Sequence, residues 1–207
     1  MAVYYTVRAD VIDIAHDKPL ASDRIFVDTN VWFWLTYSRA SLGKTPPRGY
    51  QLTRYNAYTN AVLVAGGTLL HSGLNLAELV HLIEKTEHEI YEKLHVPLLL
   101  KEYRHNYPSE HQTVRAELTA VWMSVQGLSN SLDCSIDDTT TAAAFASFGN
   151  VKVDGYDLFM LETMRRNGVT NIITDDGDFV TVPGICVFTS NRGVIAAAQA
   201  QGKLITR

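Results

Sequence analysis

The sequence has little cysteine and no long apolar run, and both absences narrow the class of protein. Cys134 and Cys186 lie far apart and belong to no metal-type pair such as CxxC, so we expect two buried apolar side chains in a reducing cytosol. The longest mostly apolar stretch, 61–70, is interrupted by Gly66 and Gly67 and is too short to span a bilayer. The chain also shows no basic segment followed by an apolar one, as a secretion signal requires. We therefore expect a soluble cytoplasmic protein with no membrane association.

Internal repeats and low-complexity stretches are also missing from the 207 residues, of which 46% are hydrophobic. A chain of this size can bury one substantial core, because a typical domain has about 100 to 200 residues. We expect a single domain over 1–207. Within it we delimit an N-terminal extension, 1–22, to which the sequence assigns no role, and a basic loop insertion, 39–56.

Acidic residues are absent between Asp28 and Glu78, although the net charge of the chain is −4. The same stretch contains four cations, so it carries +4 and the remainder of the chain carries −8. Tyrosines are interleaved with these cations. Such a mixture suits single-stranded nucleic acid, because cations attract phosphates and aromatic rings stack on bases. The alternative is a solvated loop whose tyrosines pack locally. The candidate RNA-binding residues are Arg39, Lys44, Arg48 and Arg54.

Short apolar segments alternate with helix-like segments along the whole chain. We predict strands within 3–15, 24–28, 67–72, 131–137, 170–174 and 184–190. Helices are predicted over 31–40, 54–65, 76–94, 109–127, 139–149, 155–167 and 192–202, and Asn75, Asp137 or Asp138, and Asp154 are candidate N-caps. This alternation predicts an α/β fold, in which a mainly parallel sheet has helices on both faces.

Five carboxylates follow a predicted strand or begin a predicted helix. Strand-to-helix loops of an open parallel sheet all lie at its carboxyl edge, where the functional crevice of such folds is found. We therefore expect these side chains to face one pocket. They are Asp28 after the first buried strand, Glu78 in the first turn of its helix, Asp157 at the third position of its helix, and Asp176 and Asp178 after the strand 170–174.

Carboxylates held close together raise one another's pKa values unless a divalent cation offsets their charge. Oxygen ligands without nearby Cys or His favour Mg²⁺ or Mn²⁺ over Zn²⁺, and such ions support phosphodiester hydrolysis. Each acid also has a local explanation. First-turn acids gain about 0.3 to 1 kcal/mol from the helix dipole, and residues 175–178 could form a turn in which Gly177 adopts a positive φ. We favour the metal site because all the local explanations would have to hold together.

Four stretches, "IFVDTNVW", "HSGLNLAEL", "DGYDLFMLETMRRNG" and "IITDDGDF", resemble the signature blocks of PIN domains in the same order. The resemblance implies a three-layer α/β/α sandwich and a Mg²⁺- or Mn²⁺-dependent ribonuclease. It implies that Asp28, Asp157 and Asp176 bind the metal directly. Glu78 and Asp178 would complete the site, and Thr174 would orient a carboxylate or a water. Asp175 is expected to be a bystander turned to solvent or a residue that tunes the site.

PIN domains include the VapC-type toxins, so the resemblance also implies an antitoxin partner and a homodimer. The N-terminal extension, the basic loop and the long segment after Glu78 depart from a compact toxin. Two alternatives stay open. One is a catalytically inactive PIN-like module that binds RNA or protein. The other is a different Mg²⁺-dependent phosphohydrolase with an Asp nucleophile, although Asn30 stands where that chemistry commonly uses a second Asp.

Overall fold

One parallel sheet of six strands organises the protein, of which the computed structural model describes residues 3–207. The strand order is β1-β6-β5-β2-β3-β4, and every neighbouring pair is parallel. The strands are β1 (Asp10–Asp13), β2 (Arg24–Val27), β3 (Thr68–His71), β4 (Asn130–Ser131), β5 (Asn171–Ile173) and β6 (Cys186–Thr189). The predicted N-terminal strand is β1, which forms one edge of the sheet beside β6.

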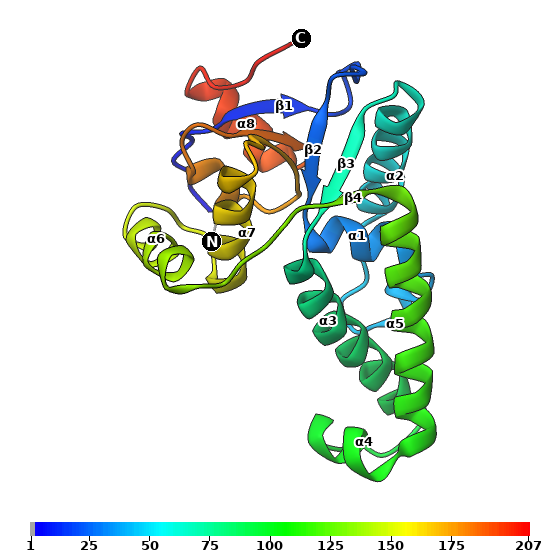
Figure 1. Cartoon of the computed structure of the whole chain (residues 1–207). Helices are drawn as coiled ribbons and strands as arrows, with labels where there is room; N and C mark the ends of the chain where they lie inside the picture. The colour runs from blue at the N-terminus through cyan, green and yellow to red at the C-terminus, as the bar shows by residue number, and fades with distance from the viewer. Residues whose placement is uncertain (1–2) are drawn as a thin grey trace.

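Helices connect the strands and cover the sheet (Figure 1). They are α1 (Thr29–Thr36), α2 (Gly49–Val64), α3 (Gly73–Glu92), α4 (Leu100–Asn106), α5 (Pro108–Leu128), α6 (Asp138–Phe148), α7 (Gly155–Arg166) and α8 (Arg192–Ala200). Two 3₁₀ turns, η1 (Ala40–Leu42) and η2 (Asp178–Thr181), complete the described chain. Within residues 3–207, none of these helices has the length and apolar character needed to cross a membrane.

The sheet separates two hydrophobic cores, because successive strand residues point to opposite faces. Phe26 and Ile172 pack in the core that α6, α7 and α8 cover. Ile25 and Ile173, the neighbours of these residues in the sequence, pack in the core that α1, α2, α3 and α5 cover. The predicted α/β class and the three-layer α/β/α arrangement are therefore confirmed.

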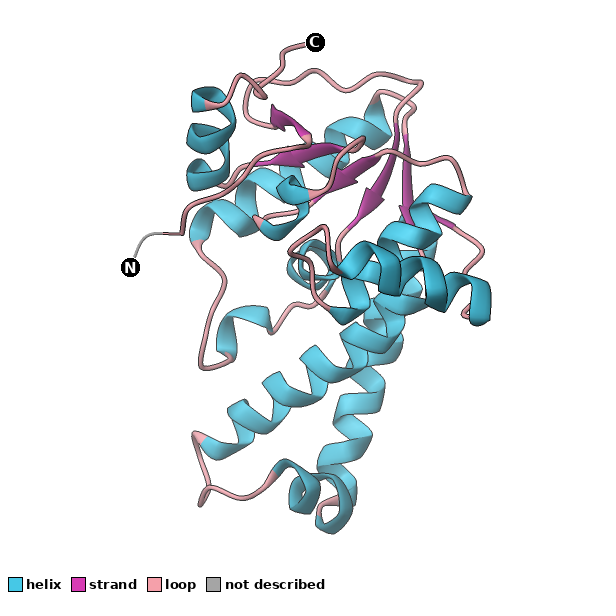
Figure 2. Cartoon of the chain, turned by 90° about the vertical axis from the view of Figure 1, so that its left-hand side faces the viewer, coloured by secondary structure: helices cyan, strands magenta, loops and turns pink. Residues whose placement is uncertain are grey.

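Helices α3, α4 and α5 extend away from the sheet as a helical arm, which both cartoon views show (Figures 1 and 2). The arm begins at the carboxyl end of β3, where α3 starts, and α5 returns the chain to β4. Helix α5, Pro108–Leu128, agrees closely with the predicted helix 109–127.

Three predicted boundaries were wrong. Helix α2 begins at Gly49, so the expected basic loop, 39–56, is irregular only over 43–48. The strand predicted over 131–137 is reduced to Asn130–Ser131 at the sheet edge. Helix α3 begins one turn earlier than predicted, because Ser72 occupies the N-cap position and its backbone N–H donates to Asn75 Oδ1 at 2.8 Å. Asn75 thus lies inside the helix, and Asp137 rather than Asp138 caps α6.

Candidate active site

Asp28 and Thr174 lie side by side because their strands are neighbours. Val27 of β2 pairs with Ile173 of β5, so the residues that follow them leave the sheet at the same place. The Thr174 hydroxyl donates to Asp28 Oδ2 at 2.7 Å, and the Asp28 backbone N–H donates to the Ile173 carbonyl at 3.0 Å. Strand β2 has β5 on one side and β3 on the other. The chain leaves β2 toward β3 on one side, whereas β5 and β6 lie on its other side. Asp28 therefore follows the strand at which the strand order reverses, which is where open α/β sheets form their crevice.

Glu78 reaches this edge from the second turn of α3 and not from the first turn as predicted, because the helix starts at Gly73. The Thr29 hydroxyl donates to the Glu78 carboxylate. Thr29 is itself held by the Asn75 amide, which donates to Thr29 Oγ1 at 2.9 Å and to the Val27 carbonyl at 3.2 Å. A chain of hydrogen bonds, more than the helix dipole, thus fixes the carboxylate.

Asp157 is the third residue of α7, as predicted, and Asp154 is the N-cap. Asp154 Oδ1 accepts the backbone N–H groups of Tyr156 at 3.1 Å and Asp157 at 3.3 Å. The Asp157 side chain is buried, with 7% of the residue exposed. The pKa of this carboxyl is raised to about 9. Burial is the largest cause, and the negative charges of neighbouring acids add to it, namely those of Asp28, Asp154, Asp176 and Glu78.

The loop after β5 folds around its own hydroxyl and carboxylate groups. The Asp176 backbone N–H donates to Thr174 Oγ1 at 2.9 Å, and the Asp178 backbone N–H donates to Asp176 Oδ1 at 2.8 Å. Burial is the main cause that raises the pKa of each aspartate, and the charge of Asp154 contributes to both. Asp178 additionally feels the charge of Asp176.

Asp28 is the most central of these acids. The pKa of Asp28 is raised to about 7. Burial is the largest cause, the Thr174 hydrogen bond opposes the rise, and the charges of Glu78 and Asp176 add to it. The pKa of Glu78 is also raised, first by burial and then by the charge of Asp154. The carboxylates thus influence one another electrostatically across β2, α3, α7 and the loop after β5. The structure brings the five predicted acids to one edge of the sheet.

The donor chemistry of this cluster fits a hard divalent cation, because its side chains offer carboxylate oxygens without Cys or His. The carboxylates are, however, spaced widely. Within residues 3–207, no group of three or more His, Cys, Asp or Glu side chains is gathered closely enough to hold a metal ion. Binding a cation would therefore require the carboxylates to move closer together.

Sequence reasoning missed Tyr5, which packs on the acidic loop. A Cβ atom placed on Gly177 would lie 2.2 Å from Tyr5 Cε1, so only glycine fits under the ring. The φ angle of Gly177 is −75°, so the suggested positive-φ turn was wrong and close packing explains this glycine. Burial raises the pKa of the Tyr5 phenol, and the charges of Asp176 and Asp178 raise it further. Asn75 and Asp154 were noticed only as N-caps, because their tertiary contacts leave no local pattern.

Asp175 is not turned to solvent. Its carboxylate accepts hydrogen bonds from the Tyr50 hydroxyl at 2.9 Å, the Gln51 amide at 2.8 Å and the Tyr55 hydroxyl at 2.6 Å. These three donors belong to α2, so Asp175 ties that helix to the end of β5. Its negative charge also contributes to the raised pKa of Asp176. Asp175 is therefore a structural anchor that also affects the electrostatics of the cluster.

The basic segment is largely occupied by contacts within the chain. Arg39 pairs with a Glu87 oxygen at 3.2 Å, Lys44 pairs with Glu92 at 2.6 Å, and Arg54 donates to the Ser190 hydroxyl at 3.0 Å. Tyr37, Tyr55 and Tyr58 are buried, which agrees with local packing of these rings. Arg48 instead lines a hollow of about 460 Å³ beside α1, α2 and α3. A role in RNA binding stays a prediction for all four cations.

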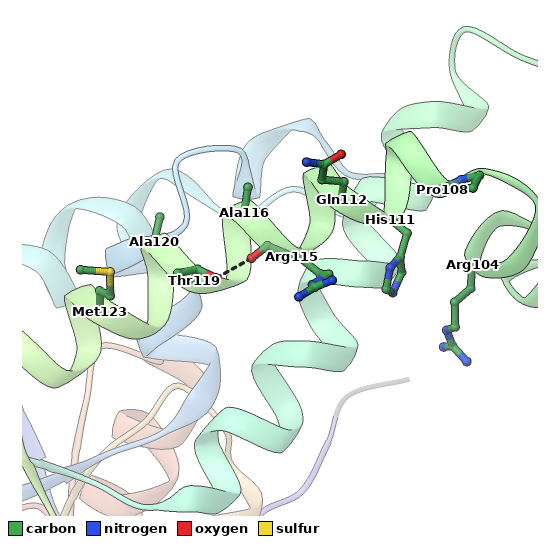
Figure 3. Close-up of a pocket in the computed structure, with 9 residues that line it drawn as sticks. All are labelled: Arg104, Pro108, His111, Gln112, Arg115, Ala116, Thr119, Ala120 and Met123. Carbon is green, nitrogen blue, oxygen red and sulfur yellow. Dashed lines mark hydrogen bonds between the residues drawn. The ribbon is translucent and has the colours of Figure 1, made fainter.

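A larger hollow, about 880 Å³, lies on the helical arm and contains none of the five carboxylates. Figure 3 shows the side chains of Arg104, His111 and Arg115 on one side of it. Arg104 is already bound to Glu84, with Nε donating to Oε1 at 2.5 Å. The small and polar residues along α5 complete the wall. This groove is therefore distinct from the acidic cluster.

No protein-family model matches the chain, and no curated protein matches it. Among solved structures, the chain is similar to the crystal structure of VapBC2 from Rickettsia felis bound to a DNA fragment from their promoter. The two share 14% identity with a TM-score of 0.46, and the match covers 80% of this chain and 98% of that chain. At this level of identity and structural agreement, the likeness does not bear on function.

Proposed function

We propose that the protein is a divalent-metal-dependent ribonuclease that hydrolyses RNA phosphodiester bonds at its acidic cluster. The observation that carries the proposal is geometric: four separate segments bring carboxylates to one edge of the sheet, where Asp28 and Asp157 are buried. Burial and the charges of neighbouring carboxylates raise the pKa of both side chains. Such a concentration of buried negative charge is unfavourable without a counter-charge and is typical of functional sites.

In this proposal, Asp28, Asp157 and Asp176 hold Mg²⁺ or Mn²⁺, and Glu78 and Asp178 complete the site directly or through water. A bound divalent cation would supply charge neutralisation of the phosphate and activation of a water nucleophile. The chain's own contribution is to orient the ligands and to limit their hydration. Thr174 fixes Asp28 through a 2.7 Å hydrogen bond, which keeps that carboxylate at the sheet edge.

A more specific form of the proposal is the toxin of a toxin–antitoxin pair. Its support is the order of the four signature blocks, which the sequence shares with PIN domains. An antitoxin partner and a homodimer belong to this form. It is tested by growth arrest upon expression of the wild-type chain; unimpaired growth, with the protein present, would contradict the toxin role but not the nuclease activity.

The nuclease proposal is tested with purified protein and labelled single-stranded RNA in Mg²⁺, in Mn²⁺ and in EDTA. Asp28→Asn should abolish cleavage while the circular dichroism spectrum stays native. Asp10→Asn is the matched control, because Asp10 is exposed and is the first residue of β1, at the amino ends of the strands and away from the acids at their carboxyl ends. Cleavage retained in Asp28→Asn, or undiminished in EDTA, would overturn the proposed site.

The same assay separates the alternatives. A wild-type protein that binds RNA without cleaving it, at any divalent-metal concentration, would support the inactive binding module. Hydrolysis of a phosphomonoester such as p-nitrophenyl phosphate, without RNA cleavage, would support the other phosphohydrolase.

A further inference from the structure

The hollow of about 460 Å³ beside the acidic cluster, which we call the Trp34 cleft, combines aromatic and cationic walls. Its principal lining residues are Asn30, Phe33, Trp34, Arg48, Tyr50 and Lys85. We infer that this cleft binds one nucleotide of a single-stranded RNA substrate, with the base stacked on Trp34 and a phosphate held by Arg48 and Lys85. The inference rests on the proposed ribonuclease function and names the part of the substrate that the chain recognises.

The Trp34 cleft adjoins the acidic cluster through three separate segments. Asn30 lines the cleft and lies two residues after Asp28, in the first turn of α1. Asp175 also lines the cleft and directly precedes Asp176. On α3, the lining residue Leu82 lies one turn after Glu78, on the same side of the helix. A nucleotide in the cleft would therefore lie next to a phosphodiester bond at the acids.

The aromatic side chains that line the cleft, Phe33 and Trp34, are held in place by packing against other rings. Trp34 is partly exposed, and its ring packs against the buried Tyr55 ring with centroids 5.6 Å apart. Phe33 packs against Tyr37 with centroids 5.1 Å apart. Small-ligand sites commonly enclose about 300 to 1,000 Å³, so the cleft has room for one nucleotide. Bases of a duplex are already stacked and paired, whereas an unpaired base can leave the strand and stack on an aromatic ring.

The cleft lining contains two cations, Arg48 and Lys85, that can contact a phosphate, and two carboxylates, Glu89 and Asp175. Within residues 3–207, neither Arg48 nor Lys85 takes part in an ion pair. The two acidic lining residues are already engaged. Glu89 accepts the Lys44 backbone N–H at 2.7 Å, and Asp175 accepts its three hydrogen bonds from α2. Within residues 3–207, Arg48 and Lys85 are thus the charged side chains of this wall that have no acidic partner.

The first test uses tryptophan fluorescence in EDTA, so that cleavage does not interfere. A single-stranded RNA hexanucleotide should quench the wild-type emission, because a stacked base contacts Trp34. Trp34→Phe should remove most of this quenching. Trp122→Phe is the matched control and should keep it, because Trp122 packs against His71, away from the cleft lining. Quenching retained in Trp34→Phe, or lost in Trp122→Phe, would overturn the assignment.

The second test measures RNA affinity by fluorescence anisotropy, with circular dichroism to confirm folding. Trp34→Ala should weaken binding by about fivefold to 150-fold, because loss of one base–aromatic stack costs about 1 to 3 kcal/mol. Arg48→Gln with Lys85→Gln should weaken binding and lower its dependence on salt. Equal affinity for a blunt RNA duplex, or unchanged affinity in folded Trp34→Ala, would overturn the inference.

The two proposals fail in different ways. If the wild-type chain cleaves RNA but Trp34→Ala and Trp34→Phe bind as the wild type does, only the cleft assignment fails. If the wild-type chain binds RNA through Trp34 but never cleaves it with any divalent metal, the nuclease proposal fails and the cleft remains an RNA site.

Discussion

Replacing Asp157 by Asn should stabilise the fold while abolishing RNA cleavage. The Asp157 carboxyl has a pKa of about 9 in the folded protein, against 3.8 for an unperturbed side chain, and burial is the largest cause of the difference. Between these two values the unfolded chain releases a proton that the folded chain retains. Rising pH therefore favours the unfolded state, and this destabilisation is absent below about pH 4 and complete above about pH 9.

The size of the effect at pH 7 follows from the distance between pH 7 and the unfolded value. That distance is about 3 pH units, and each unit corresponds to about 1.36 kcal/mol, so ionisable Asp157 costs up to about 4 kcal/mol. Asn cannot ionise and has nearly the same shape. The Asp157→Asn variant should then gain up to about 4 kcal/mol at pH 7, and little at pH 4.5.

Urea unfolding in EDTA at pH 4.5, 7 and 8.5, followed by circular dichroism, measures this gain. Asp10→Asn is the control, since an exposed carboxylate should change stability by no more than about 0.5 kcal/mol. Excess Mg²⁺ should narrow the difference, because a cation that binds only the folded wild type stabilises it. A variant less stable than the wild type at pH 8.5, or an equal gain at all three pH values, would refute the electrostatic reasoning.

Three further predictions concern individual side-chain contacts. Asp175→Ala should lower the free energy of urea unfolding by about 1 to 3 kcal/mol, because the buried Tyr55 hydroxyl loses an acceptor at 2.6 Å; an unchanged value would contradict the anchor role. Gly177→Ala should cost about 1 to 3 kcal/mol by overpacking against Tyr5, and adding Tyr5→Ala should recover part of that loss; a strictly additive double mutant would contradict the packing. Arg207, near the C-terminus, pairs with the buried carboxylates of Asp17 at 2.9 Å and Asp23 at 2.5 Å. Arg207→Ala should therefore cost about 3 to 5 kcal/mol in the same assay, because both carboxylates lose their guanidinium partner; a loss below 1 kcal/mol would argue against these ion pairs.

The parallel sheet and most of the candidate site could be predicted from the sequence because both depend on local patterns. A short apolar run followed by Asp28, and another followed by Thr174, identify two strand ends. Once the strands are parallel, their carboxyl ends must share an edge, and the 2.7 Å hydrogen bond between these side chains follows from strand adjacency. The position of Asp157 was equally predictable, since Asp154 is a strong N-cap before an amphipathic helix.

Contacts between distant segments could not be predicted in this way. Nothing near Gly177 in the sequence indicates that Tyr5, from the other end of the chain, will pack on it. Asp175 is one of three aspartates in the same loop and is not distinguished from the others by the sequence, yet three side chains of α2 donate hydrogen bonds to it. Helix α3 starts early because Ser72 and Asn75 hydrogen-bond each other: the Ser72 backbone N–H donates to Asn75 Oδ1, and the Asn75 backbone N–H donates to the Ser72 carbonyl. Asn75 alone suggests a helix that starts after it. For Gly177 and Asp175, the residue's role is set by a contact with a segment far away in the sequence.

The hydrogen bonds around the cluster divide its acids into two kinds, and this division bears on where a cation would act. Asp28, Glu78 and Asp176 each receive a hydrogen bond that lowers the pKa against burial, from Thr174, Thr29 and the Asp178 backbone respectively. For Asp157, burial and four neighbouring charges all raise the pKa, and for the more exposed Asp178 burial and two neighbouring charges do so. Asp157 is therefore the carboxylate whose ionisation depends most on an external positive charge. A bound divalent cation should lower its pKa more than that of Asp28, so proton release upon Mg²⁺ binding near pH 8 should fall sharply in Asp157→Asn; undiminished release would contradict this ordering.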